Sequence, residues 1–558
     1  MSYQAIALSA RFQRAGARAH AVRDWLLGVR PLYVLSALVA VQVLAVLALA
    51  LTVRHNGWIY YMGGDQLWHY TGAYLIVHGK LAPTYVGVGW STILAPIAWI
   101  AGPDLVSALP AIILFNVFVL LPLGLLCMYG IGERIAGRIF GYWTALLWIV
   151  VPFVGIPYAL HGYHQKWTEL TLPQLLGLGA MSDYPSMIAL VVGAYLCLRA
   201  VDGGHWVWPA GAGLAVGYAL AVKPSDSVFL VAPALLFVVF RRRAVVAFAL
   251  GLVPCLTALA FWKVRGEGNL PWRTTEPPRA VALGPNGFTH RYLRDNSWPQ
   301  LHNNLLQLRE QLWSDRILEF LVIAGLAALI VRSRRGALFV GAWFTVFLLL
   351  KGTYVNSRVE DATFWRLLMP AFPAFVILVA AVPLLVPGLR AHHAMPRPWS
   401  VPRRLVVAVL AVLVALLSLF PIALIAATKP IRGPRPAAFD LNSTLVSESP
   451  SLQLRAQSTG GVVRLRWRPS RPSPGAIFYS VYRNPGSSDT VCGPVRHAPD
   501  LCSFYAQKLV TSRTTEFVDS PGAGTWTYRI GITANWLDDT QYGDVYVFSR
   551  PATVTVHA

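Results

Sequence analysis

An acidic residue, Asp65, stands in the segment Gly63-Gly64-Asp65-Gln66, soon after the first long apolar run of the chain. The two glycines before it let the backbone approach another group closely. A carboxylate placed here could act as a general base that takes a proton from a hydroxyl group. It could equally cap a helix expected over 66–78, because aspartate is a favoured N-cap residue. The two interpretations are compatible, and Asp65 is the first candidate catalytic residue.

A second carboxylate and two cations stand at the borders of later apolar runs. Asp183, in Ser182-Asp183-Tyr184-Pro185, could orient a substrate or help to hold a divalent cation. Lys223 and Arg366 are charged donors of the kind that binds phosphate oxygens strongly. The alternative for these two cations is that each buries its apolar stem and extends its charged end to water.

Two histidines and a glutamate, His161, His164 and Glu169, occur in the segment that precedes Asp183. Histidine and carboxylate ligands together suit a divalent metal ion. The alternative is that these residues are polar residues of a membrane interface. A divalent metal is therefore a possible cofactor.

The composition indicates that these residues belong to a membrane protein. The hydrophobic set makes up 55% of the 558 residues and the charged set only 13%, whereas soluble domains carry about 25% charged residues. The net charge of +22 lies mostly in short clusters between apolar runs, which is typical of topology signals. Nucleic acid is therefore not an expected partner.

About eleven apolar runs are candidates for spanning helices, which need roughly 20 apolar residues each. They are 31–53, 106–129, 138–158, 184–200, 206–222, 226–240, 244–262, 316–332, 336–350, 367–387 and 405–427. The runs 206–222 and 226–240 are short and could form one kinked element, but a tight hairpin fits the charges better.

The basic residues of the short loops predict the orientation of the chain. With the basic N-terminus, 1–30, in the cytoplasm, every short loop assigned to that side is basic. The odd span count then places the C-terminal part outside the cell. Three long segments of the membrane domain 31–427 also fall outside, at 54–105, 159–183 and 263–315, and the first of them contains two short apolar stretches expected to lie in the interface.

The C-terminal part predicts an all-β sandwich over 456–558, after a linker over 428–455. Alternating segments broken by glycine, proline and serine are typical of short strands, and they occur at 462–467, 477–483, 516–519, 525–530 and 545–548. Cys492 and Cys502 lie in this part and could form a disulfide in an oxidising, extracytoplasmic compartment.

Four segments in order resemble the GT-C superfamily of membrane glycosyltransferases. They are the Asp65 segment with its His78-Gly79 and Leu94-Ala95-Pro96 sequel, the Asp183 segment, Gly217 to Pro224, and Phe364 to Pro373. The resemblance covers roughly residues 20–425. Many relatives have Asp-Glu where this chain has Asp65-Gln66, and a Tyr-Pro-Pro where it has Tyr85-Val86-Gly87. The C-terminal part resembles a fibronectin type III module, with Trp467 as its early core tryptophan.

The resemblance implies an inverting glycosyltransferase, of the mannosyl, aminoarabinosyl or arabinosyl kind, in the plasma membrane. Such enzymes pass a hexose or pentose from a polyprenyl-phosphate donor to a hydroxyl of a glycan, lipid or protein on the extracytoplasmic face. Asp65 would then be the base, and Lys223 and Arg366 would bind the donor phosphate. The alternatives are a lipid or sugar transporter or flippase, and a non-catalytic membrane scaffold that presents the β domain. A transporter would place ionisable residues near mid-membrane, whereas here they gather at the ends of the apolar runs.

Overall fold

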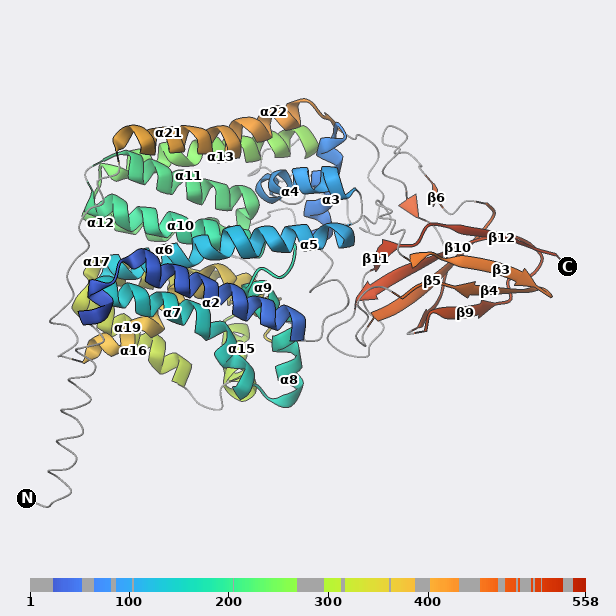
Figure 1. The fold of residues 1–558 in the computed structure, drawn as a ribbon, viewed down its shortest axis with the longest axis horizontal. Coiled ribbons are helices and arrows are strands. Elements are labelled where there is room, and N and C mark those ends of the chain that lie inside the picture. The colour runs from blue at the N-terminus through green and yellow to red at the C-terminus, as the bar shows by residue number, and fades with distance from the viewer. Residues whose placement is uncertain are drawn as a thin grey trace, which may run out of the picture.

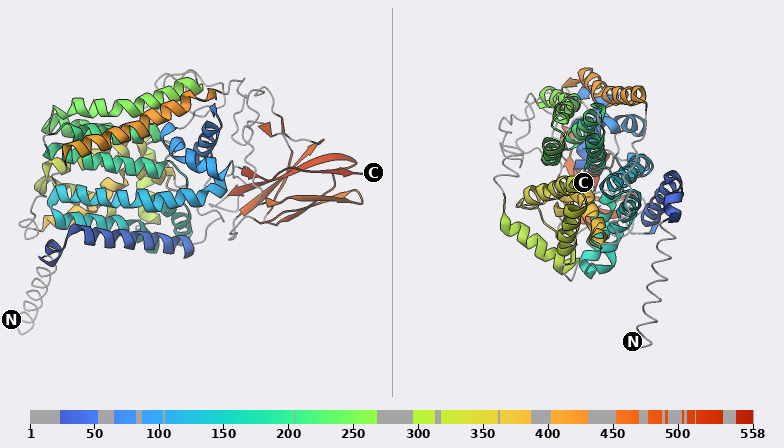
Figure 2. Two further views of the ribbon diagram at one scale, coloured as in Figure 1. Left: turned by 45° about the horizontal axis from the view of Figure 1, so that its top comes forward. Right: turned by 90° about the vertical axis from the view of Figure 1, so that its left-hand side faces the viewer.

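The computed structural model of the chain has a large helical part followed by a smaller β part (Figure 1). It describes residues 24–52, 65–81, 87–102, 105–203, 205–267, 296–312, 317–360, 363–386, 402–430, 452–469, 477–487, 490–491, 503–504, 507–512, 514–534 and 545–557. The strands lie beyond the end of the helical part at which α3 (Asp65–Val77) and α4 (Val88–Ala101) are found (Figures 1 and 2).

Seven described helices are long and apolar enough to cross a membrane. They are Pro31–Thr52, Ala108–Ala136, Arg138–Tyr158, Asp183–Asp202, Ala244–Gly266, Thr363–Leu385 and Arg404–Ala426. Their length matches the roughly 20 residues that a bilayer requires, and they identify the chain as a membrane protein. Shorter apolar helices occur at Val88–Ala101, Val207–Val222, Pro224–Phe240 and Phe320–Arg332. The count of eleven spans therefore stays a prediction.

Most of the remaining helices coincide with predicted apolar runs. The helices are α5 (Leu105–Phe115), α6 (Leu121–Ala136), α7 (Arg138–Tyr158), α8 (His161–Lys166), α9 (Leu172–Leu175), α10 (Asp183–Asp202), α11 (Val207–Val222), α12 (Val231–Phe240), α13 (Ala244–Glu267), α15 (Trp298–Gln311), α16 (Ile317–Arg332), α17 (Arg334–Lys351), α18 (Thr363–Leu368), α19 (Phe372–Ala381), α21 (Arg403–Val414) and α22 (Phe420–Ala426). Of these, α8, α9 and α15 lie in the long segments 159–183 and 263–315, for which no spanning helix was predicted. Short π- or 3-10-helical segments join several of them; η1 (Asn116–Leu120) links α5 to α6, and η3 (Pro224–Leu230) leads into α12.

Basic loop residues gather at one end of the helical part. Asp202, at the end of α10, accepts hydrogen bonds from Arg134 at 2.6 Å and from Arg335 at 3.3 Å. Arg241, directly after α12, donates to the carbonyl oxygens of Ala200 and Gly203 at the same end of α10. The loops predicted to share the cytoplasmic side are thus neighbours in space.

The segments 206–222 and 226–240 form a hairpin, which is the arrangement that the charged residues around them predicted. Lys223, at the end of α11, pairs with Asp183 at the start of α10. Arg241, at the end of α12, instead contacts the last turn of α10. Since the two contacts lie at opposite ends of α10, the chain reverses between α11 and α12.

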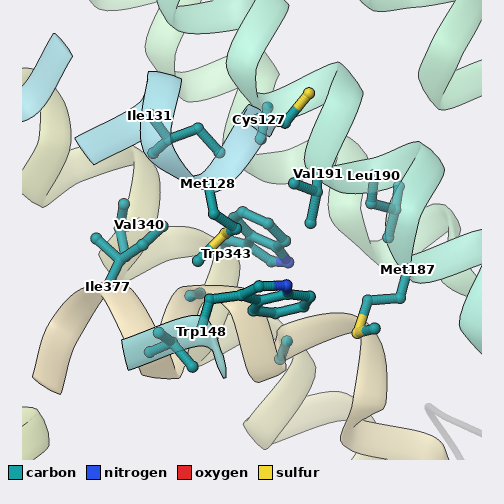
Figure 3. Close-up of a cluster of buried hydrophobic side chains, with 14 of the residues drawn as sticks. Cys127, Met128, Ile131, Trp148, Met187, Leu190, Val191, Val340, Trp343 and Ile377 are labelled. Atoms are coloured by element: carbon teal, nitrogen blue, oxygen red, sulfur yellow. The ribbon is translucent and has the colours of Figure 1, made fainter. Parts of the chain in front are cut away.

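Close helix packing depends on small residues. A side chain at Gly213 would overlap the carbonyl oxygen of Phe248, and one at Gly251 would overlap that of Ala210. These glycines let α11 and α13 approach to backbone contact, as small residues do between membrane helices. Larger side chains fill the centre between other helices, where Trp148 from α7 and Trp343 from α17 are buried in one cluster (Figure 3).

The β part consists mainly of two antiparallel sheets. The first joins β3 (Arg455–Thr459), β4 (Val462–Arg466) and β9 (Glu516–Asp519). The second has the order β11-β10-β5-β8, with β12 also paired to β10; its strands are β5 (Ile477–Pro485), β8 (Gln507–Ser512), β10 (Gly524–Ala534), β11 (Val545–Phe548) and β12 (Ala552–Val556). All five segments predicted as strands are confirmed.

Side chains of both sheets form the core of the β part. Val463 and Leu465 come from one sheet, and Tyr479, Val481 and Ile530 from the other. Trp467 packs edge-on against Tyr479, with the ring centroids 5.5 Å apart. Shared burial of this kind is what a two-layer sandwich requires.

Candidate functional site

Asp183 is the centre of a charge cluster at the end of the helical part opposite the basic loops. Its side chain is wholly buried, and each of its oxygens meets one cation. Lys223 Nζ pairs with Oδ1, and Arg366 Nε lies 3.3 Å from Oδ2. The two cations are partly exposed: the Lys223 side chain is 13% exposed and the Arg366 side chain 30%.

Helix ends place all three residues. Asp183 lies in the first turn of α10, where the helix dipole stabilises a negative charge. Lys223 ends α11 in an extended conformation, and Pro224 then starts η3. The amide N–H of Asp226 donates to the carbonyl oxygen of Lys223 at 2.9 Å, so that the turn carrying Lys223 is closed.

The loop that leads into Asp183 is held by side chains from three other elements. The N–H of Ala180 donates to Gln66 Oε1 at 2.6 Å, and Trp90 Nε1 donates to the carbonyl oxygen of Ala180 at 2.7 Å. Asn116 Nδ2 lies 2.8 Å from the carbonyl oxygen of Gly177. Buried backbone groups of an irregular segment are thereby satisfied, and the position of Asp183 is fixed.

Position 65 lies near the loop that precedes Asp183, because it is the first residue of α3 and the second is bonded to that loop. The Asp65 side chain lies outside the described part. The next residue, Gln66, is wholly buried and bonded to the loop before Asp183, so the start of α3 lies beside that loop. Gln66 therefore has a structural role here.

Glycines at the start of α4 bring this helix against the end of α11. A side chain at Gly87 would overlap the carbonyl oxygens of Ala221 and Val222, and one at Gly89 would lie 2.8 Å from Val222 Cγ2. The hydroxyl of Tyr218 donates to the carbonyl oxygen of Gly89 at 3.3 Å. The start of α4 is thus in direct contact with the residues that precede Lys223.

His69 is a member of this region that sequence reasoning missed. It lies one turn after Asp65 on α3, so positions 65 and 69 share a face of the helix. Its ring is buried, and within the described residues its Nδ1 has no hydrogen-bond partner. Burial, together with the charges of Lys223 and Lys263, lowers the pKa of His69 to about 3. The i, i+4 spacing from Asp65 was the signal that could have identified it.

The segment 159–183 contributes aromatic side chains more clearly than metal ligands. Trp365 Nε1 donates to the Tyr163 hydroxyl at 2.7 Å, which donates to the carbonyl oxygen of Val359 at 3.0 Å. Trp167 packs edge-on against Trp365, with the centroids 4.9 Å apart. These contacts fix the residue next to Arg366.

The predicted metal ligands are spread along α8 and the segment after it. His161 and His164 are exposed on α8, and the side chain of Glu169 lies outside the described part. Among the residues that the structure describes, no three histidine, cysteine, aspartate or glutamate side chains form a potential metal site. Cys492 and Cys502, the predicted disulfide, also lie outside the described residues.

Comparisons with known proteins give weak similarity. No family model and no curated protein matches the sequence. Two solved structures of the Archaeoglobus fulgidus oligosaccharyltransferase are similar, one tethered to an acceptor peptide containing the NVT sequon and one in the apo form. The first has a TM-score of 0.38 and 12% identity, covering 72% of this chain and 56% of that chain. The second has a TM-score of 0.36 and 13% identity, covering 70% and 55%.

The chain thus spans little more than half the length of the oligosaccharyltransferase. At these TM-scores the overlap carries no argument about function, which has to rest on the residues themselves.

Proposed function

We propose that this chain is an inverting membrane glycosyltransferase of the GT-C type, which moves a sugar from a polyprenyl-phosphate donor to a hydroxyl acceptor. The observation that carries the proposal is the cluster of Asp183, Lys223 and Arg366 at helix ends opposite the basic loops. A site at the ends of membrane helices lies at the depth of a lipid phosphate.

The cluster has the charge that a phosphate site needs. One carboxylate faces two cations, which leaves one positive charge, and the carboxylate is the buried member. An approaching ligand therefore meets the cationic side chains of Lys223 and Arg366. Charge-assisted hydrogen bonds from such donors stabilise the negative charge that develops on a departing phosphate.

Asp65 is the proposed base. It takes the proton of the acceptor hydroxyl while the hydroxyl oxygen attacks the anomeric carbon of the sugar. The bond from that carbon to the phosphate oxygen breaks, and its electron pair leaves with the polyprenyl phosphate. Attack opposite the leaving group inverts the configuration of the sugar. The attachment of α3 to the loop before Asp183 supports this role, because it brings position 65 toward the cationic cluster.

For Asp183 we propose a positioning role in place of contact with the acceptor. Both of its oxygens are occupied by Lys223 and Arg366, and its side chain has no exposed surface. It pairs with both cations and so holds them at the same carboxylate.

The proposed orientation of the chain in the membrane follows the predicted topology. The N-terminus is cytoplasmic in the plasma membrane, and the site and the β part face the outside of the cell. The sheet order of the β part supports a fibronectin type III-like module, which we propose binds or positions a glycan or the acceptor. The transferred sugar is a hexose or a pentose.

The proposal is tested by transfer assays with purified protein and a panel of polyprenyl-phosphate sugars. Wild-type protein should transfer from one of these donors to a glycan, lipid or protein hydroxyl. Absence of transfer from every donor in the panel would reject the proposed activity.

A further inference from the structure

A second ion pair, Asp226–Lys351, lies close to the cluster of Asp183, Lys223 and Arg366 and is not used in the proposed transfer reaction. Lys351, the last residue of α17, pairs through Nζ with Oδ1 of Asp226 on η3. The other carboxylate oxygen, Oδ2, accepts a hydrogen bond from Ser186 Oγ at 2.6 Å. Lys351 Nζ also lies 3.4 Å from Ser225 Oγ. Both charged side chains are wholly buried.

Stability alone gives little reason for such a pair. Removing two charges from water costs several kcal/mol for each ion, and apolar residues of similar volume are often as stable or more stable. Ionisable residues inside the helical part of a membrane protein commonly have a functional role. Every polar atom of the carboxylate is satisfied, so the network is rigid.

The pair is one turn away from both partners of the neighbouring salt bridge. Asp226 is three residues after Lys223, in the turn that the Asp226 N–H closes onto the Lys223 carbonyl oxygen. Ser186 is three residues after Asp183 on α10. The carboxylate of Asp226 therefore ties the backbone that carries Lys223 to the helix that carries Asp183.

We propose that the Asp226–Lys351 pair is a positioning element, which sets where Lys223 and Asp183 meet and thereby determines the affinity for the phosphate of the donor lipid. The inference rests on the proposed function, because it concerns the same site. Lys351 and Asp226 do not touch the ligand, since neither side chain has exposed surface. Their effect passes through Lys223.

Binding of polyprenyl phosphate to the purified full-length protein tests the inference without requiring transfer. The single variants Asp226→Asn and Lys351→Met each leave one buried charge without its partner and should be less stable. The double variant removes both charges together and should recover thermal stability. Its affinity for polyprenyl phosphate should nevertheless fall about tenfold, since the turn that carries Lys223 is no longer fixed. In transfer assays of the double variant, the KM for the acceptor should not change.

Two further variants keep the test decisive. Ser186→Ala removes the 2.6 Å hydrogen bond between α10 and Asp226 and a longer one, at 3.4 Å, to the carbonyl oxygen of Ala219. It leaves both charges of the ion pair in place, so it should fold and should weaken lipid binding severalfold. Asp202→Asn removes ion pairs at the opposite end of α10 and serves as the matched control. It should bind like the wild type.

Wild-type affinity in the folded double variant would overturn the inference; if the double variant does not fold, wild-type affinity in Ser186→Ala would do so. A wild-type protein that binds polyprenyl phosphate but transfers no sugar would instead reject the proposed function. The binding affinities of the variants would then still test the positioning role.

Discussion

Arg366 and Lys223 are the residues to which the account assigns the donor phosphate. Arg366→Met removes a charge-assisted hydrogen bond from a partly exposed side chain that pairs with Asp183. We expect the KM for the polyprenyl-phosphate donor to rise by about tenfold or more, because such bonds contribute about 1.5–3 kcal/mol. The measurement is steady-state transfer kinetics at varied donor concentration.

Arg358→Met is the matched control for this variant. Arg358 is an exposed arginine eight residues earlier, between α17 and α18. If both variants raise the donor KM equally, general surface charge explains the effect, and a specific phosphate contact at Arg366 is contradicted.

His69 gives a prediction about stability and pH. Its folded-state pKa is about 3, far below the ordinary 6.5, so the folded protein excludes a proton that the unfolded chain binds. The contribution of His69 to stability is therefore complete above pH 6.5 and is lost as the pH falls toward 3. We expect the melting temperature of the wild type to fall between pH 7 and pH 4.5 by more than that of His69→Gln.

The exposed residue His205 offers the comparison for His69. His205→Gln should keep the wild-type dependence on pH. An equal fall in melting temperature for His69→Gln and the wild type would contradict the buried, neutral state of His69.

At the scale of single residues, the sequence predicted which charged residues form the candidate site better than it predicted the side chains that surround them. The meeting of Asp183, Lys223 and Arg366 could be anticipated because all three border apolar runs, and helix ends on one side of a membrane share a plane. The roles of Gln66, His69 and the Asp226–Lys351 pair could not, because each depends on which neighbour faces the side chain. Periodicity along the sequence does not contain that information.

At the scale of elements, the start of α4 contacts the end of α11 directly before Lys223, so we expect this contact to position Lys223. Gly87→Ala would force a methyl group into the carbonyl oxygens of Ala221 and Val222, at a cost of about 1–3 kcal/mol for overpacking. We expect a lower melting temperature together with weaker donor binding, measured on the same purified protein.

Gly162→Ala is the control substitution for Gly87→Ala, because an added methyl group at Gly162 meets nothing within 4 Å. Its melting temperature should equal that of the wild type or exceed it. If Gly87→Ala retains wild-type stability and donor affinity, the close approach of α4 and α11 is not required.

The two short strands β6 (Thr490–Val491) and β7 (Ser503–Phe504) border the segment that contains the predicted disulfide. They pair antiparallel, with Val491 opposite Ser503; in the sequence, Cys492 follows Val491 and Cys502 precedes Ser503. We expect mass spectrometry of the non-reduced protein, purified from membranes, to find a peptide that joins these two cysteines. Recovery of both as free thiols would contradict the bond and the extracytoplasmic placement of the β part.

The elements were predictable where burial follows a simple pattern. Long apolar runs predicted helices such as α7 and α10, and strict alternation predicted β4 and β5. The strands β3, β8 and β12 were missed. The first two are short and mostly polar and carry little pattern, whereas β12 alternates threonine with apolar residues but is only five residues long. The amphipathic helix α15 was also missed within its long outer segment, where Asn304 holds it to the carbonyl oxygen of Ser357 at 2.6 Å.

At the scale of the whole molecule, the two ends of the helical part differ in chemistry. One end combines Arg134, Arg241 and Arg335 around the last turn of α10, and the other combines the Asp183 cluster with α3 and α4. This polarity agrees with the predicted alternation of inner and outer loops, and it places the proposed site at the end of the helical part opposite the basic loops. Apolar helices shorter than a bilayer requires, such as α11, are positioned by packing against other helices, here α13, and no hydropathy pattern reveals that contact.

The central claim, that Asp65 is the base of a sugar transfer, is tested most directly by comparing sugar transfer by the wild type, Asp65→Asn and Asp202→Asn at equal protein concentration. Asparagine keeps the size of the side chain but cannot accept the proton of the acceptor hydroxyl. The account predicts that Asp65→Asn binds polyprenyl phosphate like the wild type while its kcat falls by about 100-fold or more, and that Asp202→Asn transfers normally. Equal kcat values for Asp65→Asn and the wild type would contradict the account.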